Sequence, residues 1–190
     1  MRYFIIPILF VLSCSSLKAQ EALKALISTE KGIITIELYP EKAPLTVANF
    51  LRYLESGLYN GSDFFRVCTP ENEAERDIKI EVIQAADLPE DKLFPTIPLE
   101  TTQQTGLKHE NGSLSMARGV PVSAQSSFFI CINEQPELDF GGKRNPDGQG
   151  FAVFGKVIEG MDVVLAIQSG ENENQILKQA IKIESIKKLD

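Results

Sequence analysis

Residues 32–39 read Gly-Ile-Ile-Thr-Ile-Glu-Leu-Tyr, and the alternation within this stretch decides the class of fold. Ile34, Ile36 and Leu38 fall on one face, and the residues between them fall on the other. A period of two is typical of a β-strand that is buried on one side. The apolar residues 23–28 lie just upstream, and we expect them to form the hairpin partner of this strand.

The segment that follows has the spacing of a helix. Pro44 can occupy the first turn, where the missing N–H of proline has no cost. Gly57 lies where a residue in the left-handed conformation would end the helix. Apolar residues recur at helical spacing between these two points, at Val47, Leu51, Leu54 and Leu58. A second short helix is expected at residues 161–168.

Beyond residue 61 most apolar runs are short and are separated by Gly, Pro and polar stretches. Their spacing is irregular, and they do not alternate with helices as the strands of a parallel sheet do. This organisation predicts a mainly β protein with a closed antiparallel sheet and two helices. The expected strands are residues 64–68, 78–84, 113–117, 127–132, 151–157 and 181–186.

Composition narrows the range of functions. The 190 residues are 43% hydrophobic and 24% charged, which is ordinary for one folded domain. The formal charge of −7 argues against a nucleic-acid-binding protein, which usually presents a basic face. His109 is the only histidine, which argues against a zinc site or a Ser/His/Asp triad. We expect no metal or cofactor, no nucleic-acid partner and a monomeric chain.

The first twenty residues have the pattern of a secretory signal. Arg2 precedes an almost wholly apolar run at residues 3–12, and this run is too short to span a bilayer, where about 20 residues are needed. We therefore expect the protein to be exported to the periplasm or the cell envelope.

Two processing sites compete in this segment. Cleavage after Ala19 would remove residues 1–19 as a signal peptide. The sequence that ends in Cys14, Val-Leu-Ser-Cys, resembles a bacterial lipobox, and processing there would remove residues 1–13 and lipidate Cys14. In either case we expect residues 20–190 to form a single domain, with a lipid on Cys14 as its only membrane contact.

The other cysteines and the histidine are expected to be structural. Cys68 and Cys131 lie inside apolar strand-like runs, which favours two buried free thiols over a disulfide, even in an oxidising compartment. His109 lies in a turn before a strand, and we expect it on the surface or as a residue that stabilises the turn.

One predicted strand carries an unusual residue. Arg66 stands within Phe64-Phe65-Arg66-Val67, whose other members are apolar. An arginine in such a strand usually reaches solvent or pairs with an acid. The strand pattern alone therefore assigns no function to Arg66.

Several motifs, read in order, resemble those of the cyclophilin family of peptidyl-prolyl isomerases. The resemblance covers residues 25–190. Each motif is weak alone, and it is their order along the chain that is specific. The motifs are Ala43-Pro44-x-Thr46-x-x-Asn49-Phe50, Phe64-x-Arg66-Val67, Ile83-Gln84-x-x-Asp87, Gly112-Ser113-Leu114-Ser115-Met116-Ala117, Ser126-x-Phe128-Phe129-Ile130 and Val153-Phe154-Gly155-Lys156-Val157-x-x-Gly160-Met161.

This resemblance implies a closed eight-stranded antiparallel β-barrel capped by two α-helices. Its groove would bind an extended, proline-containing polypeptide segment and isomerise the bond before proline. Rotation about a peptide bond faces a barrier of about 18–20 kcal/mol, because resonance gives the C–N bond double-bond character. A cation that donates to the proline nitrogen weakens this resonance, so the reaction needs no nucleophile, metal or cofactor.

The resemblance also assigns site residues. Arg66 would donate to the proline nitrogen, Gln84 would hold Arg66 and the peptide backbone, and Phe129 would form a wall of the proline pocket. These three are the predicted catalytic residues. The predicted substrate-binding residues are Phe64, Val82, Ala117, Arg118, Ser127, Leu138 and Phe151.

The chain departs from the family pattern at several positions. Phe65 replaces a His that usually precedes the arginine, and Ser127 stands where Gln is usual. Glu81 replaces an apolar groove residue, unless an insertion shifts the alignment. Residues 69–79 and 140–150 are insertions that we expect to shape substrate choice. The first is highly polar, and we expect the barrel to stay folded when it is trimmed.

Two functions of different classes fit these residues. The first is an exported peptidyl-prolyl cis-trans isomerase that acts on unfolded or extended protein segments. The alternative is a non-catalytic proline-peptide binding module, or holdase chaperone, on the same fold. A pure binder has less reason to keep the constellation of Arg66, Gln84, Phe129 and Leu138, so this constellation favours the enzyme.

Overall fold

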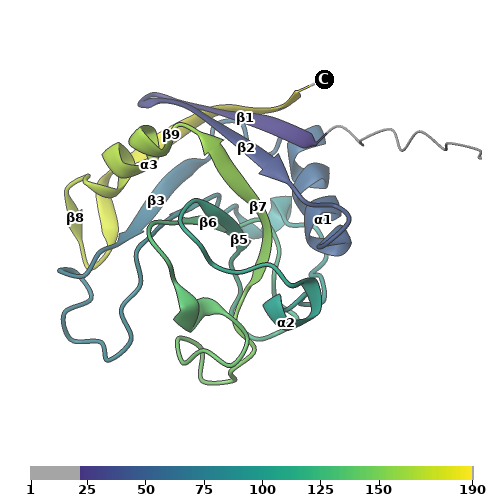
Figure 1. The fold of residues 1–190 in the computed structure, drawn as a ribbon. Helices are drawn as coiled ribbons and strands as arrows, with labels where there is room; N and C mark the ends of the chain where they lie inside the picture. The colour runs from purple at the N-terminus through teal and green to yellow at the C-terminus, as the bar shows by residue number, and fades with distance from the viewer. Residues whose placement is uncertain (1–21, 190) are drawn as a thin grey trace, which may run out of the picture.

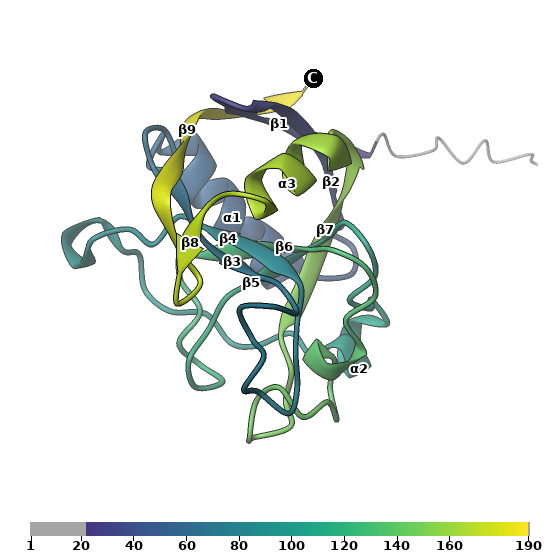
Figure 2. The same ribbon diagram turned by 90° about the vertical axis from the view of Figure 1, so that its left-hand side faces the viewer.

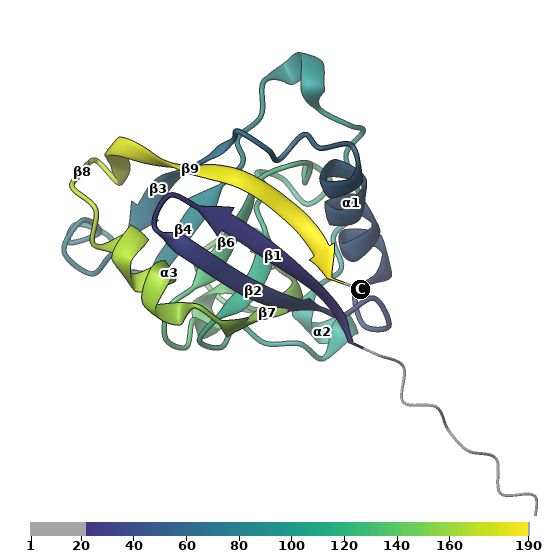
Figure 3. The same ribbon diagram turned by 90° about the horizontal axis from the view of Figure 1, so that it is seen from above.

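The computed structural model describes residues 22–189, and the predicted signal peptide and Cys14 lie outside the described residues. The described chain forms a closed antiparallel β-barrel (Figure 1). Eight strands follow one another around it in the order β1-β2-β7-β5-β6-β4-β3-β9, and pairing of β1 with β9 closes the sheet (Figure 3). The predicted eight-stranded barrel is confirmed. The strands are β1 (Leu23–Thr29), β2 (Gly32–Leu38), β3 (Asp63–Cys68), β4 (Val82–Ala85), β5 (Ser113–Met116), β6 (Phe128–Cys131), β7 (Ala152–Glu159) and β9 (Ile176–Leu189).

The stretch that decided the fold class is β2, and it forms the expected hairpin with β1. Ile34, Ile36 and Leu38 are buried, whereas Ile33 is exposed. The alternation therefore indicated the correct face.

Three strands differ from the prediction. β4 begins at Val82 and not at residue 78, because the preceding residues belong to a loop. β9 begins at Ile176 and is much longer than expected, since its exposed residues pair with β3 and then with β1. The short strand β8 (Asn172–Glu173) was not predicted and forms a tight hairpin with the start of β9.

Both predicted helices are present, and they lie on opposite sides of the barrel (Figures 1 and 3). They are α1 (Pro44–Glu55) and α3 (Met161–Gln168). A third helix of one turn, α2 (Thr102–Thr105), was not predicted, although Thr101 and Gln104 form a capping box at its start. Single 3-10 turns occur at Glu90–Lys92 and Pro136–Leu138. None of the helices within residues 22–189 is long and apolar enough to cross a bilayer.

The buried face of α1 differs from the predicted face. Val47, Phe50 and Tyr53 are fully buried, whereas Leu51 and Leu54 are only partly buried. The leucine spacing is helical, but the helix turns its aromatic side chains into the barrel end, where they bury the largest area.

Glu100 fixes the start of α1 from a distant loop. The residue before the helix, Ala43, has no side chain that could cap it. Glu100 accepts hydrogen bonds from the backbone N–H groups of Leu45 (3.1 Å) and Thr46 (2.8 Å) and from the Thr46 hydroxyl (2.6 Å). A carboxylate at this end also complements the helix dipole.

Aromatic side chains fill the barrel interior. The Phe50 ring lies 5.1 Å from that of Tyr59, 5.6 Å from that of Phe128 and 5.3 Å from that of Phe154. Phe64 joins this cluster through Phe128, at 6.2 Å. Side chains thus fill the barrel interior, and a functional site must lie on the outer surface of the barrel.

A second, smaller apolar cluster lies outside the barrel interior. Its buried members are Cys68, Ile80, Val82, Phe129, Cys131 and Leu138. The two cysteines are unpaired and buried, which confirms the expected free thiols. Burial raises the pKa of the Cys68 thiol to about 11, so this group is not a reactive thiolate.

Candidate active site

The site lies on the outer face of the barrel, where β3, β4 and β6 are neighbours. Strand alternation decides which side chains reach it. On β4, Ile83 belongs to the barrel interior and Gln84 to the outer face; on β6, Phe128 belongs to the interior and Phe129 to the outer cluster.

A β-bulge at Phe65 brings Arg66 to this outer face. The register of β3 shifts between Phe64 and Arg66 in its pairing with both β4 and β9. In a regular strand Arg66 would share the inward face with Phe64, and the extra residue reverses that alternation. Phe65 and Arg66 consequently both line the outer groove.

Two glutamines hold the guanidinium of Arg66. Its Nη1 donates to Oε1 of Gln84 (2.8 Å), which is its cross-strand neighbour on β4. Its Nε and Nη2 both donate to Oε1 of Gln175, at 2.9 and 2.6 Å. Gln175 comes from the β8–β9 hairpin, far along the chain. Arg66 therefore has both edges of its planar group fixed while its side chain remains half-buried.

A pocket of about 240 Å³ lies beside Arg66; we call it the apolar pocket after its buried apolar side chains, although Arg118 and Arg144 also line it. Val82, Phe129 and Leu138 form its buried surface, and Phe151 stands against Phe129 at 5.3 Å in an edge-to-face arrangement. The buried apolar side chains suit a small apolar ring, and Arg66 is the only charged residue of the predicted catalytic set.

The groove continues past Arg66 along the segment that joins β5 to β6. Gln84 donates to the Ser127 hydroxyl (3.0 Å), which in turn donates to the Ala85 carbonyl (2.9 Å). Ser127 and Ala117 line a further hollow of about 350 Å³ that shares Arg66 and Gln84 with the apolar pocket. The two hollows form one elongated groove, as an extended peptide requires.

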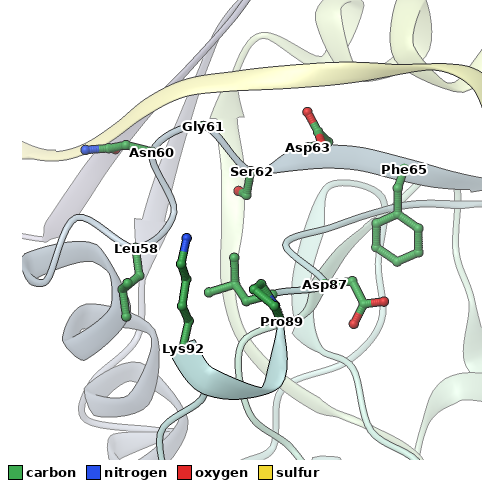
Figure 4. Close-up of a pocket in the computed structure, with 10 residues that line it drawn as sticks. Leu58, Asn60, Gly61, Ser62, Asp63, Phe65, Asp87, Pro89 and Lys92 are labelled. Carbon is green, nitrogen blue, oxygen red and sulfur yellow. The ribbon is translucent and has the colours of Figure 1, made fainter.

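A third hollow, of about 410 Å³, prolongs the groove beyond Phe65 and Asp87, which line both neighbouring parts (Figure 4). Leu58, Pro89 and Lys92 form much of its wall. This is the largest of the three hollows, and Phe65, not Arg66, borders it, so it lengthens the groove away from the guanidinium.

The 140–150 insertion is fixed to the groove through Arg118. The guanidinium of Arg118 donates to the Gly150 carbonyl (2.8 Å) and to both carboxylate oxygens of Asp147 (2.8 and 3.0 Å). It also lies over the Phe151 ring, 5.3 Å from the centroid. The side chain of Arg118 thus supports the pocket wall.

A buried ion pair joins this insertion to the other one. Glu73, in the 69–79 insertion, is 1% exposed, and both of its carboxylate oxygens accept hydrogen bonds from Arg144. The two loops lie side by side below the barrel (Figure 2). They add Arg76, Arg144 and Asn145 to the lining of the apolar pocket.

This geometry can be compared with known proteins. The family described as cyclophilin type peptidyl-prolyl cis-trans isomerase/CLD matches residues 24–188. The chain belongs to the cyclophilin family. It is a peptidyl-prolyl cis-trans isomerase.

Individual relatives agree with this membership. A peptidyl-prolyl cis-trans isomerase of Streptomyces antibioticus is 36% identical over 169 residues, which cover 85% of this chain and 95% of the relative. Peptidyl-prolyl cis-trans isomerase B of Escherichia coli K12 is 36% identical over 167 residues, which cover 83% and 94% of the two chains.

Solved cyclophilin structures share the fold. A cyclophilin-type isomerase of Cryptosporidium parvum superposes with a TM-score of 0.71 at 23% identity, covering 89% of this chain and 98% of that one. The same protein in the presence of the dipeptide Ala-Pro gives a TM-score of 0.68 at 24% identity, covering 86% and 96%.

The cyclophilin pocket is supported from behind by His109, which the structure places differently from our expectation. His109 is 2% exposed, so it is not a surface residue. Its Nδ1 lies 2.8 Å from Oδ1 of Asp139 and its Nε2 lies 2.9 Å from the Ser115 hydroxyl. Its ring stacks on Phe129 with 6.1 Å between centroids. His109 therefore braces the pocket wall.

Burial is the largest influence on His109 and lowers its pKa, although the Asp139 carboxylate opposes this change. Burial also opposes ionisation of Asp139, but hydrogen bonds from His109 and Lys108 outweigh it and lower the pKa of that carboxyl. The pair is thus a neutral imidazole that donates to an ionised carboxylate.

Two expectations about the cyclophilin site are corrected. Phe64 does not line the groove, because it points into the barrel and is fully buried. Glu81 does not replace a groove residue, since its carboxylate accepts a hydrogen bond from Asn133 (3.0 Å) and Ile80 joins the apolar cluster instead.

The other predicted residues are brought together. Val82, Ala117, Arg118, Phe129, Leu138 and Phe151 line the pocket with Arg66 and Gln84, and Ser127 lines the adjoining hollow. Sequence reasoning missed Gln175 and Glu73: Glu73 lies in the 69–79 insertion, and Gln175 lies in a turn that none of the family motifs includes. Among residues 22–189 there is no group of three or more His, Cys, Asp or Glu side chains that could hold a metal ion.

Proposed function

We propose that this cyclophilin isomerises X–Pro bonds in unfolded or extended segments of exported proteins, with Arg66 donating to the proline nitrogen while the apolar pocket holds the ring. The proposal rests chiefly on one observation, the fixed guanidinium of Arg66 in the lining of the pocket that Val82, Phe129 and Leu138 also line.

The chemistry follows from amide resonance. In the planar ground state the nitrogen lone pair is delocalised into the carbonyl, and the nitrogen is a poor acceptor. As the bond twists, the lone pair returns to nitrogen and can accept a hydrogen bond from Arg66. An interaction that is stronger in the twisted state than in the planar state lowers the barrier.

The apolar pocket supplies the other half of this mechanism. Phe129, Leu138 and Phe151 would enclose the proline ring and keep it still. The groove beside Ala117 and Ser127 would hold the chain before proline in an extended form, so that rotation is confined to one bond. Binding energy is thereby used to orient the segment before the bond turns.

The activity is tested by cis–trans exchange of a proline peptide measured by NMR in the presence of the processed chain. We expect acceleration at micromolar concentrations of the enzyme. Binding of the peptide without any acceleration would contradict the proposal and would favour a non-catalytic holdase on the same fold.

Export is the second part of the proposal, and it is supported by the cationic and apolar pattern of residues 1–12. Intact-mass analysis of the protein from a bacterial host is expected to show either a chain that begins at Gln20 or one that begins at a lipidated Cys14. A chain that retains Met1 would contradict export and would leave the isomerase activity unaffected.

A further inference from the structure

Gln175 links the catalytic groove to the 69–79 insertion. It lies at the turn of the β8–β9 hairpin, where its backbone has φ +74°. Its Oε1 accepts the hydrogen bonds from Nε and Nη2 of Arg66, and its Nε2 donates to Oε1 of Glu73 at 3.0 Å. A single side-chain amide therefore joins Arg66 to the buried carboxylate.

Glu73 is held as an ion. Besides Arg144 and Gln175, it accepts from the backbone N–H of Ile80 (2.7 Å), and Nε of Arg76 lies 3.6 Å from it. Burial opposes ionisation of this carboxyl, but the hydrogen bonds and charges of its partners outweigh burial and lower its pKa. Glu73 thus stays an acceptor at neutral pH.

The ionised carboxylate decides how the amide of Gln175 is oriented. An amide has one oxygen that accepts and one nitrogen that donates, and an ionised carboxylate can only accept. The nitrogen of Gln175 must therefore face Glu73, and its oxygen must face Arg66. With the amide reversed, its NH₂ group would meet the guanidinium, and neither contact could form.

We propose that Glu73 and Gln175 form a positioning pair that orients Arg66 for catalysis. The inference rests on the proposed role of Arg66 and extends it, since it gives the 69–79 insertion and the β8–β9 hairpin a function in the reaction. Neither Glu73 nor Gln175 lines the apolar pocket, so they act on the substrate only through Arg66.

The pair should affect turnover more than affinity. Gln84 alone would leave Nε and Nη2 of Arg66 without an acceptor, and the guanidinium could then rotate away from the twisted nitrogen. Apolar contacts with proline would remain. Loss of an interaction needed only in the transition state lowers kcat and leaves KM nearly unchanged.

Gln175→Asn is the principal test. Asparagine tolerates a left-handed backbone, so the hairpin turn is retained, but its side chain is one methylene shorter and cannot bridge Arg66 and Glu73. We expect kcat for isomerisation to fall about 2- to 10-fold, the range of one net hydrogen bond, with KM unchanged within about twofold. The matched control is Gln179→Asn, at an exposed position on β9, and it should retain the parent kcat.

An exchange of the two side chains tests rescue. Glu73→Gln alone leaves Arg144 buried without its counter-ion, and Gln175→Glu alone places two carboxylates together. The double variant Glu73→Gln/Gln175→Glu again has one carboxylate and one amide at positions 73 and 175. One donor–acceptor pair can therefore form between the two side chains. We expect it to be more active than either single variant.

A spectroscopic readout separates this inference from the proposed function. The Nε–H of Arg66 gives an NMR resonance whose solvent exchange is slowed by its hydrogen bond to Gln175, and exchange should accelerate in Gln175→Asn. If Gln175→Asn isomerises proline at the parent rate while Arg66→Ala is slow, the positioning pair is overturned and the proposed function stands. If the parent chain itself is inactive, the proposed function fails. Independently of activity, an unchanged rate of solvent exchange at the Arg66 Nε–H in Gln175→Asn would overturn the positioning pair.

Discussion

At the scale of single residues, His109 shows how a titratable group can serve the site without taking part in the reaction. Its neutral ring donates to Asp139 and stacks on Phe129. Because burial lowers its pKa from the ordinary 6.5, the unfolded chain binds a proton more readily than the native chain does. The free energy of unfolding should therefore decrease as the pH falls below 6.5.

Urea unfolding at pH 7.5, 6.0 and 5.0 measures this dependence. His109 is the only histidine of the sequence, and Asp139, with its pKa lowered from 3.8, contributes only at lower pH. We expect His109→Gln to be less stable at pH 7.5 and to lose most of the slope between pH 6.5 and 5.0. A parent protein equally stable across that range would contradict a buried neutral imidazole.

Phe129 differs from His109, because its side chain cannot ionise and presents an apolar surface to the pocket. Phe129→Ala should raise KM for proline peptides, since the pocket loses an aromatic wall. It should also lower the free energy of unfolding, by about 3 kcal/mol if the cavity relaxes little. Steady-state kinetics and thermal unfolding of this variant check both effects, and an unchanged KM would show that proline binds elsewhere.

At the scale of secondary-structure elements, the segment that returns to β7 depends on a glycine. Gly150 has φ +66°, and a Cβ at this position would lie 2.5 Å from the carbonyl oxygen of Leu138 and from the carbonyl carbon of Asp139. The next residue, Phe151, donates its N–H to the same Leu138 oxygen (2.9 Å). This close approach fixes the positions of Leu138 and Phe151, which form two walls of the pocket.

Gly150→Ala should therefore harm both stability and binding. The left-handed conformation alone costs roughly 1–2 kcal/mol for a residue with a Cβ, and the clash with backbone adds to this. We expect a lower melting temperature and a raised KM. Gly148→Ala is a matched control, because Gly148 also has a positive φ but no heavy atom within 4 Å of an added Cβ. Equal effects of the two substitutions would show that backbone conformation alone matters.

The 69–79 insertion is less independent than its polar sequence suggested. Most of it is exposed, but Glu73 is buried against Arg144 of the other insertion. Trimming this segment would leave Arg144 buried without its counter-ion, and an uncompensated buried charge is strongly destabilising. The barrel strands do not pass through the segment, so we now expect a folded but less stable variant, which unfolding by denaturant would measure.

At the scale of the whole molecule, the parts that sequence predicts are those with local periodicity. The alternation at residues 32–39 and the helical spacing after Pro44 indicated β2 and α1, and the order of family motifs indicated the barrel. Side-chain direction was predicted less well. The bulge at Phe65 depends on pairing with two other strands, so the sequence of β3 alone did not show that Phe64 points inward and Arg66 outward.

Contacts between distant segments could not be predicted either, because they too depend on how segments far apart in the sequence pair and pack. The Arg66–Gln175 bonds span 109 residues, and the Glu73–Arg144 pair joins two insertions that have no counterpart in the family motifs. Such contacts depend on how loops of particular length meet in space. The two insertions also depart from the family pattern, and we expect the substrate preference of this chain to arise there.

The central claim, that a fixed Arg66 lowers the barrier to rotation, is tested most directly by Arg66→Ala. The isomerisation rate at saturating proline peptide and the melting temperature should be measured on the same preparation, beside the parent chain. A hydrogen bond that involves a charged group contributes roughly 1.5–3 kcal/mol, which corresponds to a rate about 10- to 150-fold slower. We expect that loss with the fold retained, and little recovery in Arg66→Lys, whose ammonium lacks the planar fork. An Arg66→Ala protein that is folded and isomerises proline at the parent rate would contradict the account.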